Sequence, residues 1–305
     1  MDGKTVCYGS GVIGSGWATC FALHDMQVVV YDLEDAYLSG ARARISDNLR
    51  SLTEQGYLSE KNRVKAEGRI TCSTDAEQAL RDAVFIQESV PERLELKQRV
   101  VESIDRFAPA DCIVASSTSG LRISEIVEHS ARQDRYIGAH PFNPPHLIPL
   151  VEITKGARTS PETVERAVAF YRRAGKEPVV LNREKPGFIA NRLQHAVLRE
   201  VIALVTEGVC SLTDVDRALT YGPGLRWAAI GQGMIGELAS PDGAEAFNRA
   251  FRLASEGIFS DLSNLTKVPD RWLETVGPGV ADADRQHMAH LVDGDIVDLR
   301  VFPGH

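Results

Sequence analysis

The chain has 305 residues, of which 43% are hydrophobic and 25% are charged, with a formal net charge of -8 at pH 7. This length allows two domains that each bury an apolar core, and the composition is typical of a globular protein. The acidic charge excludes the dense positive surface of a nonspecific nucleic-acid-binding protein, and no apolar run approaches the roughly 20 residues of a membrane span, so we expect neither partner.

The N-terminal segment predicts a strand, a glycine turn and a helix. Residues 1–4 lack the charged and apolar stages of a signal peptide, and Lys4–Tyr8 has the pattern of a short buried strand. After the turn, residues 17–24 suit a packed helix, and the β-branched run Gln27–Tyr31 predicts a second strand. Together these segments form the beginning of a parallel βαβ unit.

The turn itself, Gly9-Ser10-Gly11-Val12-Ile13-Gly14, fits the pattern G-x-G-x-x-G. Its first glycine permits the tight turn, the second lets a pyrophosphate approach the backbone, and the third packs the helix on the strand. Asp32 follows 18 residues past Gly14, where its carboxylate can accept both ribose hydroxyl hydrogens. The acidic Glu34 and Asp35 beside it would repel a 2′-phosphate, so NAD is the expected cofactor. A glycine-rich turn beside a solvated aspartate is the alternative.

The following residues alternate between helices and strands. Residues 36–55 and 59–67 predict two helices that look inserted, and we expect them to form an exposed helical hairpin. Further strands are predicted at residues 69–72, 83–87, 112–116, 136–139, 150–154 and 177–181, and Ser160 with Pro161 predicts a helix start before the last of them. This alternation indicates a Rossmann-type, doubly wound α/β sheet.

The character of the chain changes after Lys185-Pro186-Gly187. Residues 188–207 carry apolar side chains at helical spacing, and the rest of the chain is predicted to be helical. We therefore predict a Rossmann-type domain over residues 1–183 and an all-helical domain over residues 184–305. The tail, residues 282–305, indicates only a helix and an exposed end.

Charged and polar side chains follow several strands at the carboxyl edge of the sheet, where ligands bind in such folds. Glu92 lies in the loop after the strand at 83–87, and Lys97 lies on the next helix. These two could also be solvent-facing charges at a helix start. The segment Ser116-Ser117-Thr118-Ser119 follows the next strand at the same edge.

His140 follows the strand at 136–139, and Glu152 lies in the apolar strand Leu150-Val151-Glu152-Ile153. An unpaired carboxylate in an apolar strand would be costly, so Glu152 needs a partner, and His140 is the candidate. A carboxylate bound to one ring nitrogen fixes the tautomer and makes the other nitrogen a better base. The alternative is a structural histidine.

The cysteines are odd in number, and no two form a C-x-x-C pair; they are Cys7, Cys20, Cys72, Cys112 and Cys210. The spacing predicts neither a zinc site nor a disulfide framework. We therefore expect no bound metal and a cytoplasmic location.

From Val6 to about Gly231 the chain resembles the L-3-hydroxyacyl-CoA dehydrogenase superfamily, and within it the lambda-crystallin (L-gulonate 3-dehydrogenase) and carnitine dehydrogenase branch. The segments that carry the resemblance are the glycine turn, IQESVPERLELK from Ile86, SSTS from Ser116, HPFNPPHLIPLVE from His140 and GFIANRLQ from Gly187. The acyl-CoA enzymes have S-N-T-S and H-F-F-N-P instead, which favours the gulonate or carnitine side.

The resemblance implies an NAD-dependent oxidation of a small (S)-3-hydroxy acid and a homodimer formed through the helical domain. By position, the active-site residues are Ser119, His140, Glu152 and Asn191, and the NAD contacts are Val12, Ile13, Asp32, Glu92 and Lys97. His140 would act as general base, while Ser119 and Asn191 would bind the reacting oxygen. Two other functions stay open: a CoA-thioester dehydrogenase of fatty-acid metabolism, and a noncatalytic dinucleotide-binding or crystallin-like structural protein.

Arg226 is the last candidate site residue. It is the one charge in the segment Tyr221-Gly222-Pro223-Gly224-Leu225-Arg226-Trp227-Ala228-Ala229-Ile230-Gly231. A guanidinium in such surroundings needs an anion, and a carboxylate matches its fork geometry, so we predict that Arg226 binds the substrate carboxylate. Pairing with a carboxylate of its own chain or of a dimer mate is the alternative.

Overall fold

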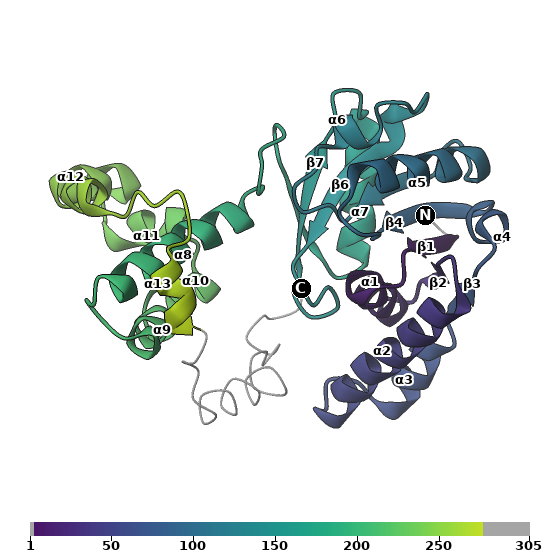
Figure 1. Ribbon diagram of the computed structural model, residues 1–305, viewed down its shortest axis with the longest axis horizontal. Coiled ribbons are helices and arrows are strands. Elements are labelled where there is room, and N and C mark those ends of the chain that lie inside the picture. The colour runs from purple at the N-terminus through teal and green to yellow at the C-terminus, as the bar shows by residue number, and fades with distance from the viewer. Residues whose placement is uncertain (1–2, 277–305) are drawn as a thin grey trace. The chain divides into compact units, whose positions relative to one another are not determined.

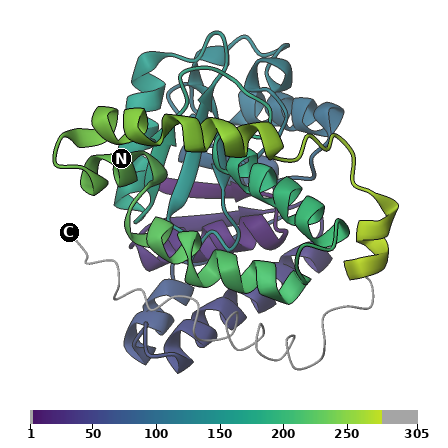
Figure 2. The same cartoon turned by 90° about the vertical axis from the view of Figure 1, so that its left-hand side faces the viewer.

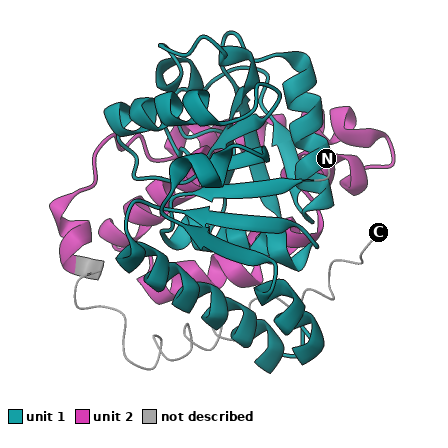
Figure 3. Cartoon of the chain, turned by 90° about the vertical axis from the view of Figure 1, so that its right-hand side faces the viewer, with its two compact units in different colours: residues 1–189, 290–305 teal, residues 190–289 magenta. Residues whose placement is uncertain are grey.

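The computed structural model describes residues 3–276. These residues divide into two compact units, one ending at Ile189 and the other beginning at Ala190 (Figure 3). The helix and exposed end expected over residues 282–305 lie outside the described residues.

The first unit contains one eight-stranded sheet. Its strands are β1 (Lys4–Tyr8), β2 (Gln27–Tyr31), β3 (Ile70–Ser73), β4 (Ala83–Glu88), β5 (Ile113–Ser116), β6 (Tyr136–Pro141), β7 (Leu150–Lys155) and β8 (Glu177–Val180). Their order is β3-β2-β1-β4-β5-β6-β7-β8, and every neighbouring pair except β6 and β7 is parallel. The doubly wound sheet predicted from the sequence is confirmed.

Helices flank this sheet on both sides (Figure 1). They are α1 (Val12–Leu23), α2 (Asp35–Glu54), α3 (Glu60–Glu67), α4 (Ala76–Leu80), α5 (Leu94–Phe107), α6 (Ile123–Ile126), the 3-10 helix η1 (Gln133–Arg135) and α7 (Pro161–Arg173). The predicted start of α7 is confirmed, because the Ser160 hydroxyl accepts the Thr163 N–H and Pro161 is the first helical residue.

Two apolar clusters cover the two faces of the sheet. Alternate side chains of a strand point to opposite faces. Cys7 accordingly packs with Trp17 and Phe170 in one cluster, while Val6 packs with Ile104 in the other. The first cluster takes residues from α1, α2 and α7, and the second from α4, α5 and α6. The sheet is therefore buried between two helical layers, which leaves its edges and strand ends for a site.

The helical hairpin predicted after β2 is present as α2 and α3, but its predicted exposure was wrong for one face of α2. One face of α2 is buried, and it includes Leu38, Ala41, Ile45 and Leu49 in the core that α1 also enters. These apolar residues recur at helical spacing within a polar segment, so they make a narrow stripe that packs inward. The hairpin is thus an integral layer of the first unit.

The second unit is all-helical, in green to yellow in Figure 2. Its described helices are α8 (Ala190–Thr206), α9 (Leu212–Tyr221), α10 (Pro223–Ala229), α11 (Gln232–Ala239), α12 (Gly243–Asp261) and α13 (Asp270–Val276). The predicted change to a helical C-terminal domain is confirmed. Across residues 3–276, no helix combines the length and the apolar character that crossing a membrane requires.

Candidate active site

The glycine turn between β1 and α1 has the conformation that its pattern predicts. Gly9 has φ 103°, and a Cβ there would lie 2.9 Å from the Ser89 carbonyl oxygen. A Cβ at Gly14 would lie only 1.9 Å from the Gly9 oxygen, whereas a Cβ at Gly11 would meet nothing within 4 Å. The first and third glycines are therefore required by packing, and the second leaves open space against the backbone. That space, at the N-terminus of α1, suits a phosphate group.

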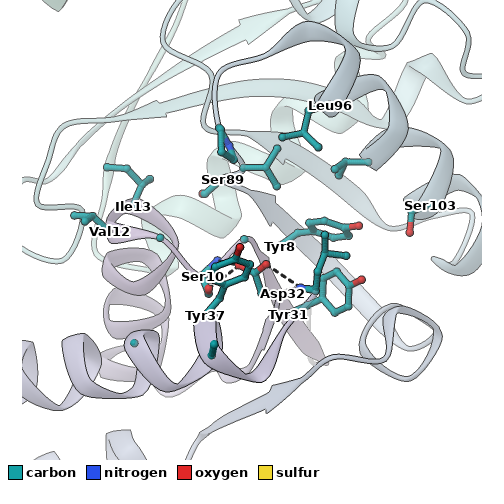
Figure 4. Close-up of a pocket in the computed structure, with 18 of the residues that line it drawn as sticks. Tyr8, Ser10, Val12, Ile13, Tyr31, Asp32, Tyr37, Ser89, Leu96 and Ser103 are labelled. Carbon is teal, nitrogen blue, oxygen red and sulfur yellow. Dashed lines mark hydrogen bonds between the residues drawn. The ribbon is translucent and has the colours of Figure 1, made fainter.

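The Asp32 carboxylate is hydrogen-bonded to this turn. Its Oδ2 accepts the Ser10 N–H at 2.8 Å and the Ser10 hydroxyl at 2.6 Å, and its Oδ1 accepts the Leu33 N–H at 2.8 Å. An ionised carboxylate has about four acceptor sites, two on each oxygen, so one site remains free on Oδ1. The turn and the predicted ribose-binding carboxylate thus form one hydrogen-bonded unit (Figure 4).

A cavity of about 1070 Å³ opens beside this unit. Its wall includes the glycine turn, Asp32, Ser89 from the loop after β4, and α5 residues such as Leu96 and Ser103 (Figure 4). It lies where β1 neighbours both β2 and β4, which is the position at which doubly wound sheets bind nucleotides. Val12, predicted to contact the cofactor, is 61% exposed on this wall. The cavity, its glycines and its carboxylate fit a dinucleotide such as NAD.

Glu92 holds the loop that follows β5. Its Oε1 accepts the Thr118 hydroxyl at 2.6 Å, the Ser119 N–H at 2.9 Å and the Gly120 N–H at 3.0 Å. Burial alone would raise the pKa of the Glu92 carboxyl. The Thr118 hydroxyl, the Lys97 charge and the loop amides instead lower that pKa. Glu92 is therefore an anion that orders the Ser119 backbone, and its Oε1 also accepts the Ser119 hydroxyl at 3.4 Å, at the carboxyl edge of the sheet.

Lys97 is almost completely buried, with 1% exposure, and its ammonium is bound within the protein. Its Nζ donates to Glu88 Oε1 at 2.8 Å and Oε2 at 3.0 Å, and it lies 3.5 Å from Glu92 Oε2. Glu88 in turn accepts the hydroxyl of Ser116 and the N–H of Val90. Lys97 thus links the two carboxylates that hold the strand ends and the Ser119 loop.

The predicted pairing of His140 with Glu152 is confirmed. The two residues are directly opposite each other on the antiparallel strands β6 and β7. His140 Nδ1 lies 3.2 Å from Glu152 Oε2, and Glu152 is 1% exposed. Because the Glu152 oxygen accepts the proton on Nδ1, the lone pair of neutral His140 is on Nε2. This arrangement leaves Nε2 able to accept a proton at the carboxyl edge of the sheet.

The last residues of the first unit, Phe188 and Ile189, contact this pair. Glu152 Oε1 accepts the Ile189 N–H at 2.8 Å, and the Phe188 ring lies 5.3 Å from the His140 ring. Phe188 has φ 49°, in the left-handed region that a bulky residue rarely adopts. Strain of this kind persists where the surrounding structure imposes it, and it is common at functional sites.

The other two predicted site residues, Asn191 and Arg226, belong to the second unit. Asn191 is on the first turn of α8, where its carbonyl oxygen lies 2.7 Å from His195 Nδ1. Arg226 is exposed on α10 and forms no ion pair with any carboxylate of residues 3–276. Pairing of Arg226 with a carboxylate of its own chain, the alternative, is therefore not seen within the described residues.

Two participants were missed in the sequence. The role of Glu88 was predictable from the sequence. Lys97 lies on the same buried face of α5 as Val101 and Ile104, so its charge needs a buried anion. The role of Arg44 was not predictable, since it lies nine residues into a polar helix, yet it donates to the Ser10 carbonyl oxygen of the glycine turn. Only the packing of α2 beside α1 brings these residues together.

Two family models match the chain. Residues 4–184 match the NAD binding domain of 3-hydroxyacyl-CoA dehydrogenase, and residues 187–255 match the C-terminal domain of the same family. Part of the first match is the segment that forms the dinucleotide cavity. These matches confirm the resemblance seen in the motifs, the enzyme class and NAD as the cofactor.

Relatives and solved structures agree with these models. The chain is 40% identical to an L-carnitine dehydrogenase of Streptomyces griseus, over 80% of this chain and 71% of that one. It is 43% identical to an L-carnitine dehydrogenase of Bacillus cereus, over 75% and 69% of the two chains.

Among solved structures, 5-formyl-3-hydroxy-2-methylpyridine 4-carboxylic acid 5-dehydrogenase, an NAD+ dependent dismutase, superposes with TM-score 0.84 and 30% identity over 98% of both chains. FadB2 of M. tuberculosis superposes with TM-score 0.73 and 26% identity over 92% of this chain and 94% of that one. The chain is an NAD-dependent oxidoreductase and belongs to the 3-hydroxyacyl-CoA dehydrogenase family.

Proposed function

We propose that this enzyme oxidises the 3-hydroxyl of a small (S)-3-hydroxy acid such as L-carnitine, with His140 as the general base. The observation that carries the proposal is the buried His140–Glu152 pair, at the same edge of the sheet as the dinucleotide cavity. The L-carnitine dehydrogenases among the relatives support the substrate class.

In the proposed reaction, His140 Nε2 removes the proton of the substrate 3-hydroxyl while a hydride leaves the carbon that bears this hydroxyl. When bound, NAD supplies the hydride acceptor at its nicotinamide ring. Glu152 keeps Nδ1 of His140 protonated and stabilises the imidazolium that forms. Ser119 and Asn191 would hydrogen-bond the reacting oxygen as its charge changes. Gly11, Val12, Ile13 and Asp32 line the cavity and would hold the cofactor, and Glu92 with the buried Lys97 of α5 would support that site through the Ser119 loop.

A substrate panel with L-carnitine, L-gulonate, 3-hydroxybutyrate and acetoacetyl-CoA tests this function directly, with NADH absorbance as the readout. We expect a free 3-hydroxy acid to be oxidised with a higher kcat/KM than that for reduction of acetoacetyl-CoA. Preference for the CoA thioester would favour a fatty-acid enzyme instead. No turnover with these four or with the aromatic acid considered below would favour a noncatalytic dinucleotide-binding or crystallin-like protein.

A second candidate substrate is an aromatic carboxylic acid. The structural match to the pyridine carboxylic acid dehydrogenase extends over 98% of both chains, so the fold of that enzyme accounts for both units here. Both candidate substrates are small molecules that contain a carboxylate. The panel therefore includes 5-formyl-3-hydroxy-2-methylpyridine 4-carboxylic acid, and its turnover in place of the hydroxy acids would select the second candidate.

We propose Arg226 as the ligand of the substrate carboxylate. Its guanidinium is exposed and unpaired within the described residues, and a carboxylate matches its fork. Replacing it in Arg226→Lys should raise KM for an acidic substrate about tenfold or more while leaving NAD affinity unchanged, because lysine cannot form the bidentate pair. Steady-state kinetics with the preferred acid checks this. The matched variant Arg217→Lys, on α9, should leave KM unchanged, and an unchanged KM in Arg226→Lys would contradict the assignment.

Asp32 should determine the cofactor preference. We expect kcat/KM with NAD to exceed that with NADP by at least about tenfold, or roughly 1.4 kcal/mol, since the carboxylate repels a 2′-phosphate. Asp32→Ala should narrow this ratio. Its control is Glu54→Ala, which removes an exposed acidic side chain at the end of α2, does not line the cavity and should leave the ratio unchanged. Equal kcat/KM for both cofactors in the wild-type enzyme would refute the role.

Three further proposals concern the domain boundary, the oligomeric state and the location of the enzyme. The boundary between the NAD-binding domain (1–183) and the helical domain (184–305) is supported by the division of the described chain after Ile189. A homodimer through the helical domain is supported by exposed apolar side chains on α12, where Leu253 is 82% and Phe259 is 69% exposed. A monomeric mass in solution would contradict the dimer.

All five cysteines are free thiols, which supports a cytoplasmic location of the enzyme. Secretion of the enzyme would contradict this location.

A further inference from the structure

Arg44 places a positive charge on the wall of the dinucleotide cavity. It lies on α2, and it lines the cavity together with Ala36, Tyr37 and Gly40 of the same helix. Gly40 lies four residues after Ala36 and three after Tyr37, and Arg44 lies four residues after Gly40, so these positions form one face of α2. Arg44 is half-buried, and its guanidinium is therefore partly shielded from water.

The guanidinium is held by two oxygens of the turn and of α1. Arg44 Nη2 donates to the Ser10 carbonyl oxygen at 2.6 Å, and Nε donates to the Ser15 hydroxyl at 3.2 Å. The Ser15 hydroxyl also donates to the Ser10 carbonyl oxygen, at 3.0 Å. Because Asp32 accepts both the N–H and the hydroxyl of Ser10, every polar group of Ser10 is fixed by these three neighbours.

The charge of Arg44 has no counterion within the described residues. Both of its bonds are to neutral oxygens, and no carboxylate of residues 3–276 forms an ion pair with it. A guanidinium carries more N–H groups than these two bonds use. A partly buried cation with free donors on the wall of a cavity is complementary to an anionic ligand.

The Arg44 guanidinium lies close to the backbone of Gly40, which has no side chain to contact it. A Cβ at Gly40 would lie 3.2 Å from Arg44 Nη1, closer than an ordinary van der Waals contact. A larger residue at position 40 would require the Arg44 guanidinium to shift by a few tenths of an ångström. Gly40 and Arg44 are one helical turn apart and both line the cavity.

We propose that Arg44 is a phosphate-binding residue of the dinucleotide site, an inference that rests on the proposed NAD-dependent function. The ligand of this cavity is anionic only at its phosphates. The N-terminus of α1, one residue beyond Gly11, favours the same charge. Arg44 thus adds a full positive charge to a turn that otherwise has only backbone N–H groups, and through Ser10 it couples phosphate binding to the Asp32 carboxylate.

The test compares ligands with and without phosphate on the full-length protein. Dissociation constants of ADP-ribose, adenosine 2′-phosphate and adenosine are measured by isothermal titration for the wild type and Arg44→Met. We expect ADP-ribose to bind about tenfold more weakly to the variant, because a charge-assisted bond to phosphate is lost, and adenosine to bind equally well. Arg50→Met, an exposed arginine on the same helix that does not line the cavity, should change none of the three.

The ligands also separate the two phosphate positions. A loss confined to adenosine 2′-phosphate would support phosphate binding at the ribose 2′ position in place of the diphosphate. An equal loss for adenosine, or no loss for either phosphate, would overturn the proposal. If Arg44→Met unfolds, Arg44→Lys gives the same readout, with a loss of about threefold for the phosphate ligand alone because the charge stays but the fork is lost. Failure of the wild type to bind ADP-ribose would instead contradict the NAD-dependent function.

Discussion

Replacing His140 by glutamine should lower kcat by roughly a hundredfold or more while NAD affinity stays nearly intact. The His140 ring faces Glu152 through Nδ1, so its Nε2 is the nitrogen available to take the substrate proton. An amide in its place can hydrogen-bond a hydroxyl but cannot accept its proton at neutral pH. Cofactor binding should survive, because the cavity that we assign to the dinucleotide is lined by other residues. Single-turnover NADH formation and a fluorescence titration with NADH check the two parts.

The matched control for His140→Gln is His129→Gln, since His129 is exposed and outside the cavity. It should retain wild-type turnover. Glu152→Gln should also be slower, because an amide can hold the ring but cannot stabilise the imidazolium. Near wild-type turnover in His140→Gln would overturn the mechanism, whereas a loss of NADH affinity in the same proportion would show that the histidine acts through the fold.

Lys97→Met should reduce the free energy of unfolding by about 3–5 kcal/mol. Lys97 and Glu88 are both buried, at 1% and 3% exposure, so removing the cation leaves a carboxylate that is neither solvated nor paired. The same change removes the charge that lies 3.5 Å from Glu92 Oε2, and with it part of the support for the Ser119 loop. We therefore expect a lower kcat in the protein that remains folded.

Urea unfolding of the protein without cofactor measures this effect. The double variant Glu88→Gln, Lys97→Met should recover part of the lost stability, because it no longer buries a lone charge. Lys65→Met, at the end of the outer helix α3, should change the free energy of unfolding by less than about 0.5 kcal/mol. A similarly small change in Lys97→Met would mean that the buried pair contributes little to the folded state.

The sequence determined the features that depend on near neighbours along the chain. The strands of the first unit were predictable because runs of β-branched and apolar residues bounded by turn residues favour a buried strand wherever they occur. The glycine turn was predictable from its short pattern, in which Gly9 and Gly14 leave no room for a Cβ and Gly11 leaves open space beside its backbone. The partner of Glu152 could also be inferred, because an apolar strand leaves a carboxylate no solvent and His140 is close in the chain.

Tertiary structure decided the register of the inferred His140–Glu152 pair and the polar contacts that could not be inferred. The antiparallel direction of β7 sets His140 opposite Glu152, and the packing of α2 on α1 brings Arg44 to Ser10 over 34 residues of chain. The burial of one face of α2 likewise depended on the helix beside it. Propensity and periodicity are local properties of the chain, whereas the partner of a side chain depends on strand order, register and packing between segments that are distant in sequence.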